Sequence, residues 1–210
     1  MATALIMNLQ GSPQEQKAAC RQIRDMAQSY ENKRNLKAAI DPMIALLTSA
    51  DPLVAKLAAG TLKALAINEE NEAQICQEAA AVAALVKLLG HGDALVAEQS
   101  AGTLRNLAMH AAHKEILREA GAIPPLVALL RHSDVHVQQQ AIAALRNLAA
   151  DEENKSQIAE AGAIKPLVAM VGGGEEVLQQ YAATALDALA QNHQENAAAI
   201  RQARLAMSTE

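Results

Sequence analysis

Short apolar blocks recur along the chain, each separated from the next by a polar break. Residues 120–130 read AGAIPPLVALL, and residues 161–171 read AGAIKPLVAMV. A second block follows each of them, as in AALRNLA at 143–149. The closing leucines of the second block are Leu65, Leu107, Leu148 and Leu189, at a spacing of about 41 residues. This period predicts a solenoid, whose repeats bury their apolar faces against one another.

The pattern within residues 113–154 predicts three helices. A polar segment, KEILREA, ends at Gly121, which can supply the positive φ of a helix C-cap. Pro124 and Pro125 fit the first turn of a second helix, where a missing N–H is tolerated. Asp134 follows a polar break and is a good N-cap for a longer third helix. The apolar stripe of that third helix has helical spacing and comprises Val137, Ala141, Ala144, Leu145 and Leu148.

The stretch AGAIPPLVALLRHSDVHVQQQAIAALRNLAADEENK resembles an armadillo repeat at nearly every position. The resemblance rests on the AGAI-Pro-x-Leu-Val-x-Leu-Leu block, the Val-Gln-x-x-Ala opening of the third helix and the closing Ala-Leu-x-Asn-Leu-Ala. It covers almost the whole chain and implies an all-α, right-handed α-solenoid with three helices per repeat. We expect one armadillo domain over residues 1–210. Its parts would be a partial N-terminal unit at 1–30, full repeats at 31–70, 71–112, 113–154 and 155–196, and a partial C-terminal unit or cap at 197–210.

In armadillo proteins, the solvent-facing side of the third helices forms a concave groove for extended peptides. The resemblance implies the same groove here. The family's asparagine, which hydrogen-bonds the peptide backbone, is matched by Asn106 and Asn147 and replaced by Ala64 and Ala188 in the flanking repeats. An amide suits this role because it both donates and accepts hydrogen bonds. The other expected groove residues form two neighbouring columns, namely Arg24, Lys63, Arg105, Arg146 and Asp187 in one, and Lys56, Glu98, Gln139 and Gln180 in the other.

These columns predict the charge of the partner. Four of the five residues in the first column are basic, which favours an acidic, extended peptide and resembles the catenin-type arrangement. Nuclear-import adaptors of the family carry a tryptophan four residues before the asparagine, but that position is glycine, alanine or threonine here (Gly60, Gly102, Ala143 and Thr184). The cation–π surface for lysine stems is therefore missing. Solvated positions on exposed helix faces would give the same columns.

We expect Arg105, Asn106, Arg146 and Asn147 to be accessible on one face. The predicted function is a protein-interaction scaffold or adaptor that binds an extended, acidic peptide segment. The alternative is a structural fragment, or an engineered or reconstructed repeat array, with no groove ligand of its own.

Composition narrows the choice of partner and compartment. With 51% hydrophobic and 20% charged residues, a chain of 210 residues can build a core. The net charge of −5 and the lack of stacking aromatics argue against nucleic acid. No apolar run is long enough to span a bilayer. Cys20 and Cys76 make no disulfide framework, so the expected location is the cytoplasm, and also the nucleus.

Other motifs predict little chemistry. The pairs His132/His136 and His110/His113 lack a completing cysteine or carboxylate cluster, so we expect surface histidines and no metal. The glycines at 172–174 lack the Lys-Ser/Thr of a phosphate loop and favour a flexible turn between helices. No catalytic motif stands out, so we expect neither an enzyme nor a cofactor.

The C-terminal end predicts a cap or a partner. Residues 197–207 begin another first helix but are not followed by the helices that would complete a repeat. This segment should cover the last full repeat as a makeshift cap, since solenoids need polar terminal faces. Otherwise the open end should pair with another copy in a two-fold homodimer.

Overall fold

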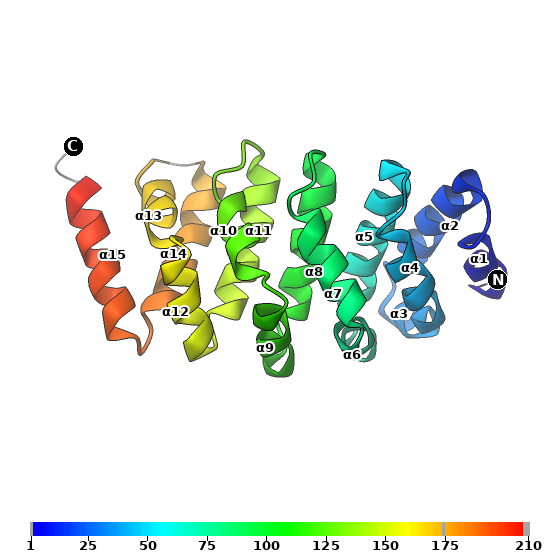
Figure 1. Ribbon diagram of the computed structural model, residues 1–210, viewed down its shortest axis with the longest axis horizontal. Helices are drawn as coiled ribbons and strands as arrows, with labels where there is room; N and C mark the ends of the chain where they lie inside the picture. The colour runs from blue at the N-terminus through cyan, green and yellow to red at the C-terminus, as the bar shows by residue number, and fades with distance from the viewer. Residues whose placement is uncertain (1, 174, 208–210) are drawn as a thin grey trace. The chain divides into compact units, whose positions relative to one another are not determined.

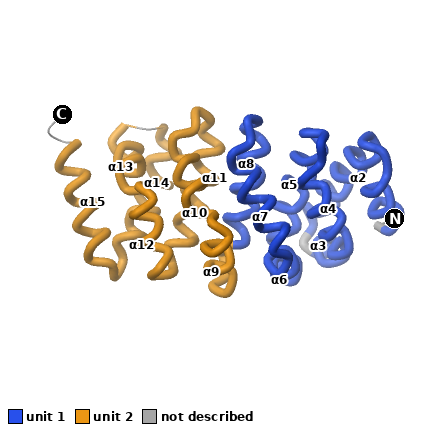
Figure 2. Tube along the Cα trace, in the orientation of Figure 1, with its two compact units in different colours: residues 1–107 blue, residues 108–210 orange. Residues whose placement is uncertain are grey.

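The computed structural model describes residues 2–173 and 175–207, and this part of the chain contains helices and no strand, as expected (Figure 1). The chain forms two compact units, residues 1–107 and 108–210 (Figure 2). None of the helices in the described part is long and apolar enough to cross a membrane.

In the first unit, the long third helices pack on one another in chain order, because α5 contacts both α2 and α8. The second helices α4 and α7 pack on α5 and α8, respectively. The elements of this unit are α1 (Ala2–Asn8), α2 (Pro13–Met26), α3 (Tyr30–Asn35), the 3₁₀ turn η1 (Lys37–Ala39), α4 (Ile40–Leu46), α5 (Pro52–Leu65), α6 (Glu69–Gln77), α7 (Ala79–Leu88) and α8 (Ala94–Leu107).

The second unit repeats this arrangement. Its third helices α11 and α14 pack together, and α10 and α13 cover them. Its elements are α9 (Ala111–Glu119), α10 (Ile123–Leu129), α11 (Val135–Leu148), α12 (Glu152–Glu160), α13 (Ile164–Gly173), α14 (Glu176–Ala190) and α15 (Gln194–Met207). The predicted stripe of α11 is buried from Val137 to Leu148.

The segment expected to be a cap lies in α15. This helix packs against α13 and α14 and buries Asn196 and Ile200. It therefore packs against the second and third helices of the last full repeat, and its role as a cap stays a prediction. The homodimer stays a prediction.

Local signals determine where the helices start and stop. Gly121 has φ +74° and Gly162 has φ +87°, the left-handed conformation that lets the chain leave a first helix and enter a second. At the start of α11, Oδ1 of Asp134 accepts hydrogen bonds from the backbone N–H groups of His136 (2.8 Å) and Val137 (3.2 Å). Asp51 caps α5 in the same way.

Replacing Asp134 with alanine should lower the free energy of unfolding by about 1 kcal/mol, because two N–H groups at the start of α11 lose their acceptor. Urea denaturation followed by circular dichroism measures the change. Ser133→Ala is the control, since Ser133 is an exposed neighbour just before the cap. Equal stability of the two variants would contradict the capping role.

The glycine run differs from its prediction. Gly172 and Gly173 continue α13 rather than forming a turn, and Gly174 lies outside the described residues. The expectation of a turn at Gly172 and Gly173 is therefore wrong. The physical reason is that a glycine in a helix costs only about 1 kcal/mol relative to alanine, which packing of the preceding apolar turns can offset.

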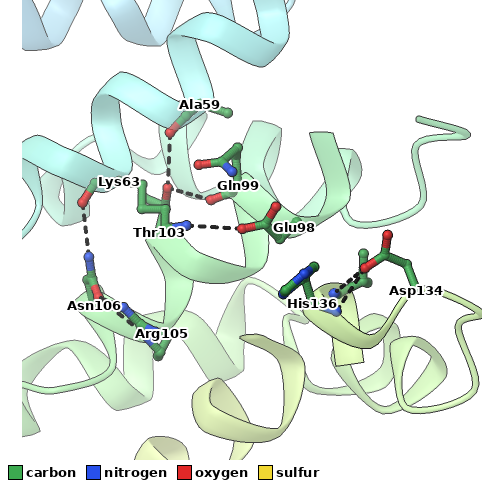
Figure 3. Close-up of polar contacts among 10 residues, drawn as sticks. Ala59, Lys63, Glu98, Gln99, Thr103, Arg105, Asn106, Asp134 and His136 are labelled. Atoms are coloured by element: carbon green, nitrogen blue, oxygen red, sulfur yellow. Dashed lines mark hydrogen bonds and ion pairs between the residues drawn. The ribbon is translucent and has the colours of Figure 1, made fainter. Parts of the chain in front are cut away.

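Buried polar side chains join successive repeats in the first unit. Oγ1 of Thr103 donates to the carbonyl of Ala59 on the preceding third helix (3.3 Å; Figure 3). Nδ2 of Asn71 donates to the carbonyls of Lys33 (2.9 Å) and Leu65 (3.2 Å). These bonds fix the register between neighbouring repeats as well as satisfying buried groups.

The two cysteines are buried free thiols, and Sγ of Cys20 lies 3.6 Å from Sδ of Met43. Burial raises the pKa of the Cys20 thiol to about 11. Burial, with the nearby Glu72 carboxylate, raises the pKa of Cys76 to about 12. Both thiols are therefore protonated and unreactive near neutral pH.

We expect the native chain to react with Ellman's reagent only as fast as it unfolds, and the urea-unfolded chain to react at once. The two raised pKa values also mean that the folded chain keeps these protons when the unfolded chain has lost them. Stability should therefore fall as the pH rises above about 9. Rapid labelling of the native protein near neutral pH would contradict the burial of the thiols.

Candidate functional site

An open cleft of about 900 Å³ lies in the second unit, where the third helices α11 and α14 end. Its walls come from the last turns of those two helices and from the first helices α9 and α12. The lining residues are Ala108, Met109, Lys114, Arg146, Asn147, Ala149, Ala150, Glu152, Lys155, Thr184, Asp187, Ala188, Gln191 and Asn192. Three of the predicted groove residues, Arg146, Asn147 and Asp187, therefore share one cleft.

Two charges in the cleft are open to solvent. Arg146 lies in the last turn of α11 and Asp187 in the last turn of α14, and both side chains are exposed. Neither forms an ion pair or a side-chain hydrogen bond with another described residue. Asn147, beside Arg146, is half-buried. The cleft thus offers one cation and one anion.

The other two cations of the cleft are already engaged by helix ends. Nζ of Lys114 donates to the carbonyls of Ala108 (2.7 Å) and Met109 (3.3 Å). Nζ of Lys155 donates to the carbonyl of Gln191 (2.6 Å) and pairs with Glu152. Both ammonium groups satisfy carbonyls that a helix C-terminus leaves open. Their role is structural.

Sequence reasoning missed these buried lysines, although a signal was present. Lys114 and Lys155 occupy the same position of successive repeats, where Lys33 and Glu72 stand in the first unit, and all four are buried. A charged residue that recurs at one repeat position is as visible in the sequence as the asparagine column. Asn192, which lines the cleft with φ 57°, was also missed.

In the first unit, internal ion pairs occupy the basic residues of the expected groove. Nζ of Lys63 lies 3.2 Å from Oε1 of Glu98, and Nζ of Lys56 lies 3.7 Å from Oδ2 of Asp93. All four side chains are partly shielded from solvent. The positive charge that Lys63 adds to the basic column is therefore largely neutralised by Glu98.

The accessibility expected of Asn106 is wrong. Its side chain is 3% exposed, and Nδ2 donates to the carbonyl of Lys63 (2.9 Å) while Oδ1 accepts from the guanidinium of Arg105 (Figure 3). The Asn106 amide thus binds the Lys63 carbonyl of the preceding repeat, which lies within hydrogen-bond distance, rather than facing a ligand. Arg105 is half-buried.

The stem of Lys63 also fills space beside Gly102. A Cβ added at Gly102 would lie 2.8 Å from Cδ and from Cε of Lys63. This is the position where nuclear-import adaptors carry a tryptophan. Here the chain's own lysine covers the glycine and reaches Glu98 beyond it.

The remaining predicted groove residues do not line the cleft. Arg24 is half-buried, with Nε 3.9 Å from Oδ1 of Asp25. Gln139 is half-buried on α11, and Gln180 is exposed on α14. None of them lines the cleft of the second unit.

Histidines of both predicted pairs make local contacts within the protein. Nδ1 of His132 accepts a hydrogen bond from the N–H of Asp134 (3.0 Å), which shapes the turn before α11. The rings of His110 and His113 lie with their centroids 5.7 Å apart. Among the described residues, no three His, Cys, Asp or Glu side chains cluster in a way that could hold a metal ion.

Comparisons with known proteins agree with this architecture. The family model for the Armadillo/beta-catenin-like repeat matches residues 68–109, 110–150 and 151–186. A designed armadillo repeat protein is 29% identical, with a TM-score of 0.90 over 97% of this chain and 88% of that one. Another, in complex with the peptide (KR)4, is 29% identical, with a TM-score of 0.88 over 96% of this chain and 87% of that one.

A third similar structure is that of computationally designed armadillo repeat proteins for modular peptide recognition. It is 29% identical, with a TM-score of 0.89 over 97% of this chain and 88% of that one. The search of curated proteins found no match. With three repeats matched by the family model and a helical scaffold shared with these structures, the chain belongs to the armadillo repeat family.

Proposed function

We propose that this protein is an interaction scaffold that binds an extended peptide segment in the cleft of the second unit, with an acidic side chain of the peptide against Arg146. The observation that carries the proposal is the exposed, unpaired guanidinium of Arg146 on the wall of an open cleft, beside Asn147. A guanidinium binds a carboxylate through two parallel, charge-assisted hydrogen bonds.

The usual spacing of packed helices suits an extended chain. Packed helices lie about 8–10 Å apart, and an extended chain rises about 3.3 Å per residue. The pair α11 and α14 would therefore meet peptide side chains about three residues apart. A relative of similar fold is in complex with the peptide (KR)4, which supports peptide binding by this scaffold.

The charge preference follows from which cations are free. Lys56 and Lys63 already pair with carboxylates of their own chain, and Lys114 and Lys155 hold helix ends. Arg146 is the cation of the cleft whose guanidinium is available to a ligand. We therefore assign the acidic contact to Arg146 rather than to a continuous basic track, and we assign binding rather than catalysis to the cleft.

The test is fluorescence anisotropy with labelled peptides of about ten residues that carry two glutamates, two lysines, or one of each, three positions apart, in a Ser/Ala background. Ala150 is exposed and lines the cleft, so Ala150→Trp should block binding by filling it. Ala128→Trp, at an exposed position of α10 away from the cleft, is the matched control. If no peptide binds, or if both tryptophan variants bind alike, the proposal fails and an array without a groove ligand is the better description.

Reversing the charge of Arg146 should weaken binding of the glutamate peptides about fivefold at low salt, because an attraction at a solvated site becomes a repulsion. The loss should shrink as salt rises, since the charges are screened. The same anisotropy titrations on Arg146→Glu measure it. Unchanged affinity at low salt would remove Arg146 from the site.

A further inference from the structure

The sign of the free charge reverses between the two third helices of the cleft. Arg146 and Asp187 occupy the same position of successive repeats, in the last turn of α11 and of α14, and both line the cleft. Within the part of the chain that is described, each lacks a charged partner. A ligand that satisfied Arg146 alone would leave the Asp187 carboxylate unmatched.

The helix ends act differently on the two charges. Each helix C-terminus carries a partial negative charge, which stabilises the cation of Arg146 but adds to the negative potential around Asp187. Lys155, the cation bonded to the C-terminus of α14, is already shared between Glu152 and the carbonyl of Gln191. The end of α14 therefore favours an additional cation from a ligand, whereas at the end of α11 the guanidinium of Arg146 supplies the positive charge that an anion would need.

We propose that the cleft selects a peptide segment with one acidic and one basic side chain about three residues apart, the acid against Arg146 and the base against Asp187. This rests on the proposed function and specifies its ligand. Because the two contacts lie on different helices, they also orient the peptide. A segment with the order acid-x-x-base and one with the order base-x-x-acid cannot both make them in one direction of binding.

The test compares four labelled peptides that are otherwise identical, with Glu-x-x-Lys, Lys-x-x-Glu, Glu-x-x-Glu and Lys-x-x-Lys cores. With the unaltered protein at low salt, one of the two mixed peptides should bind about tenfold more tightly than the other. The double variant Arg146→Glu/Asp187→Lys keeps the net charge and should reverse this preference.

Two single variants separate the contacts. Asp187→Lys should make the two-glutamate peptide the tightest ligand, and Arg146→Glu should do the same for the two-lysine peptide. Glu195→Lys/Arg201→Glu, a charge swap on exposed positions of α15, is the control and should leave every preference unchanged.

The outcomes separate the two proposals. Equal binding of the four peptides that is still abolished by Ala150→Trp would overturn the charge pairing while leaving peptide binding in the cleft intact. A mixed-peptide preference that survives the Arg146→Glu/Asp187→Lys swap would also overturn the pairing. Absence of binding by all four peptides would overturn the proposed function itself.

Discussion

Replacing Leu62 with alanine should lower the free energy of unfolding by about 2–5 kcal/mol, the largest change expected for any single substitution discussed for this chain. Leu62 is 0% exposed on α5, the helix that packs against both α2 and α8. Truncation removes apolar contacts and leaves a cavity that the flanking helices can fill only in part. Urea denaturation followed by circular dichroism measures the loss.

Leu53→Ala is the matched control because the same change is made on the same helix. Leu53 is 37% exposed, and alanine has the higher helix propensity. We expect a change of less than about 0.5 kcal/mol. A similar loss at both positions would mean that α5 does not pack between its neighbours as described.

Replacing Asn71 with alanine should lower the free energy of unfolding by about 1–3 kcal/mol. Asn71 is fully buried, and its Nδ2 is shared between the carbonyls of Lys33 and Leu65, which belong to different elements of the first unit. Without the amide, these carbonyls lose a donor in a site closed to water. The same denaturation experiment measures the effect.

Asn35→Ala is the control, since Asn35 is exposed at the end of α3. It should leave stability within about 0.5 kcal/mol of the unaltered chain. If Asn71→Ala were equally silent, the inter-repeat hydrogen bonds would add nothing to the stability of the first unit.

Much of the fold could be predicted from the sequence because its signals are local and repeated. Gly121 supplies the positive φ after a first helix, and Asp134 caps the third helix as predicted. The apolar stripe of α11 is buried because helical spacing alone decides which side faces the neighbouring helices. Each such signal depends on a few adjacent residues, and the repeat tests it several times.

Less of the candidate site could be predicted from the sequence, because the pairing of its side chains depends on contacts between repeats. A column of basic residues is visible in the sequence, but the pairing of Lys63 with Glu98, and the coverage of Gly102 by its stem, depend on rotamers and on helix spacing. Asn106 was expected to face a ligand, yet its amide bonds Lys63 of its own chain. The same donor geometry suits a peptide backbone and a neighbouring helix end equally well.

At Gly172 and Gly173 the prediction failed because local residue preference was given too much weight. Composition favours a turn, but a helix that is already packed can extend through them at a modest cost. Propensity is thus a weak guide where the preceding turns are fixed by tertiary contacts.

The central claim, that the cleft at the ends of α11 and α14 binds an extended peptide, is tested most directly by a nuclear magnetic resonance titration. The isotope-labelled protein is titrated with the tighter of the two mixed-charge peptides, and backbone amide shifts are followed residue by residue. We expect the largest shifts at Arg146, Asn147, Thr184, Asp187 and Asn192, all of which line the cleft. Shifts concentrated on α15 or on the first unit, with these five amides unmoved, would contradict the account.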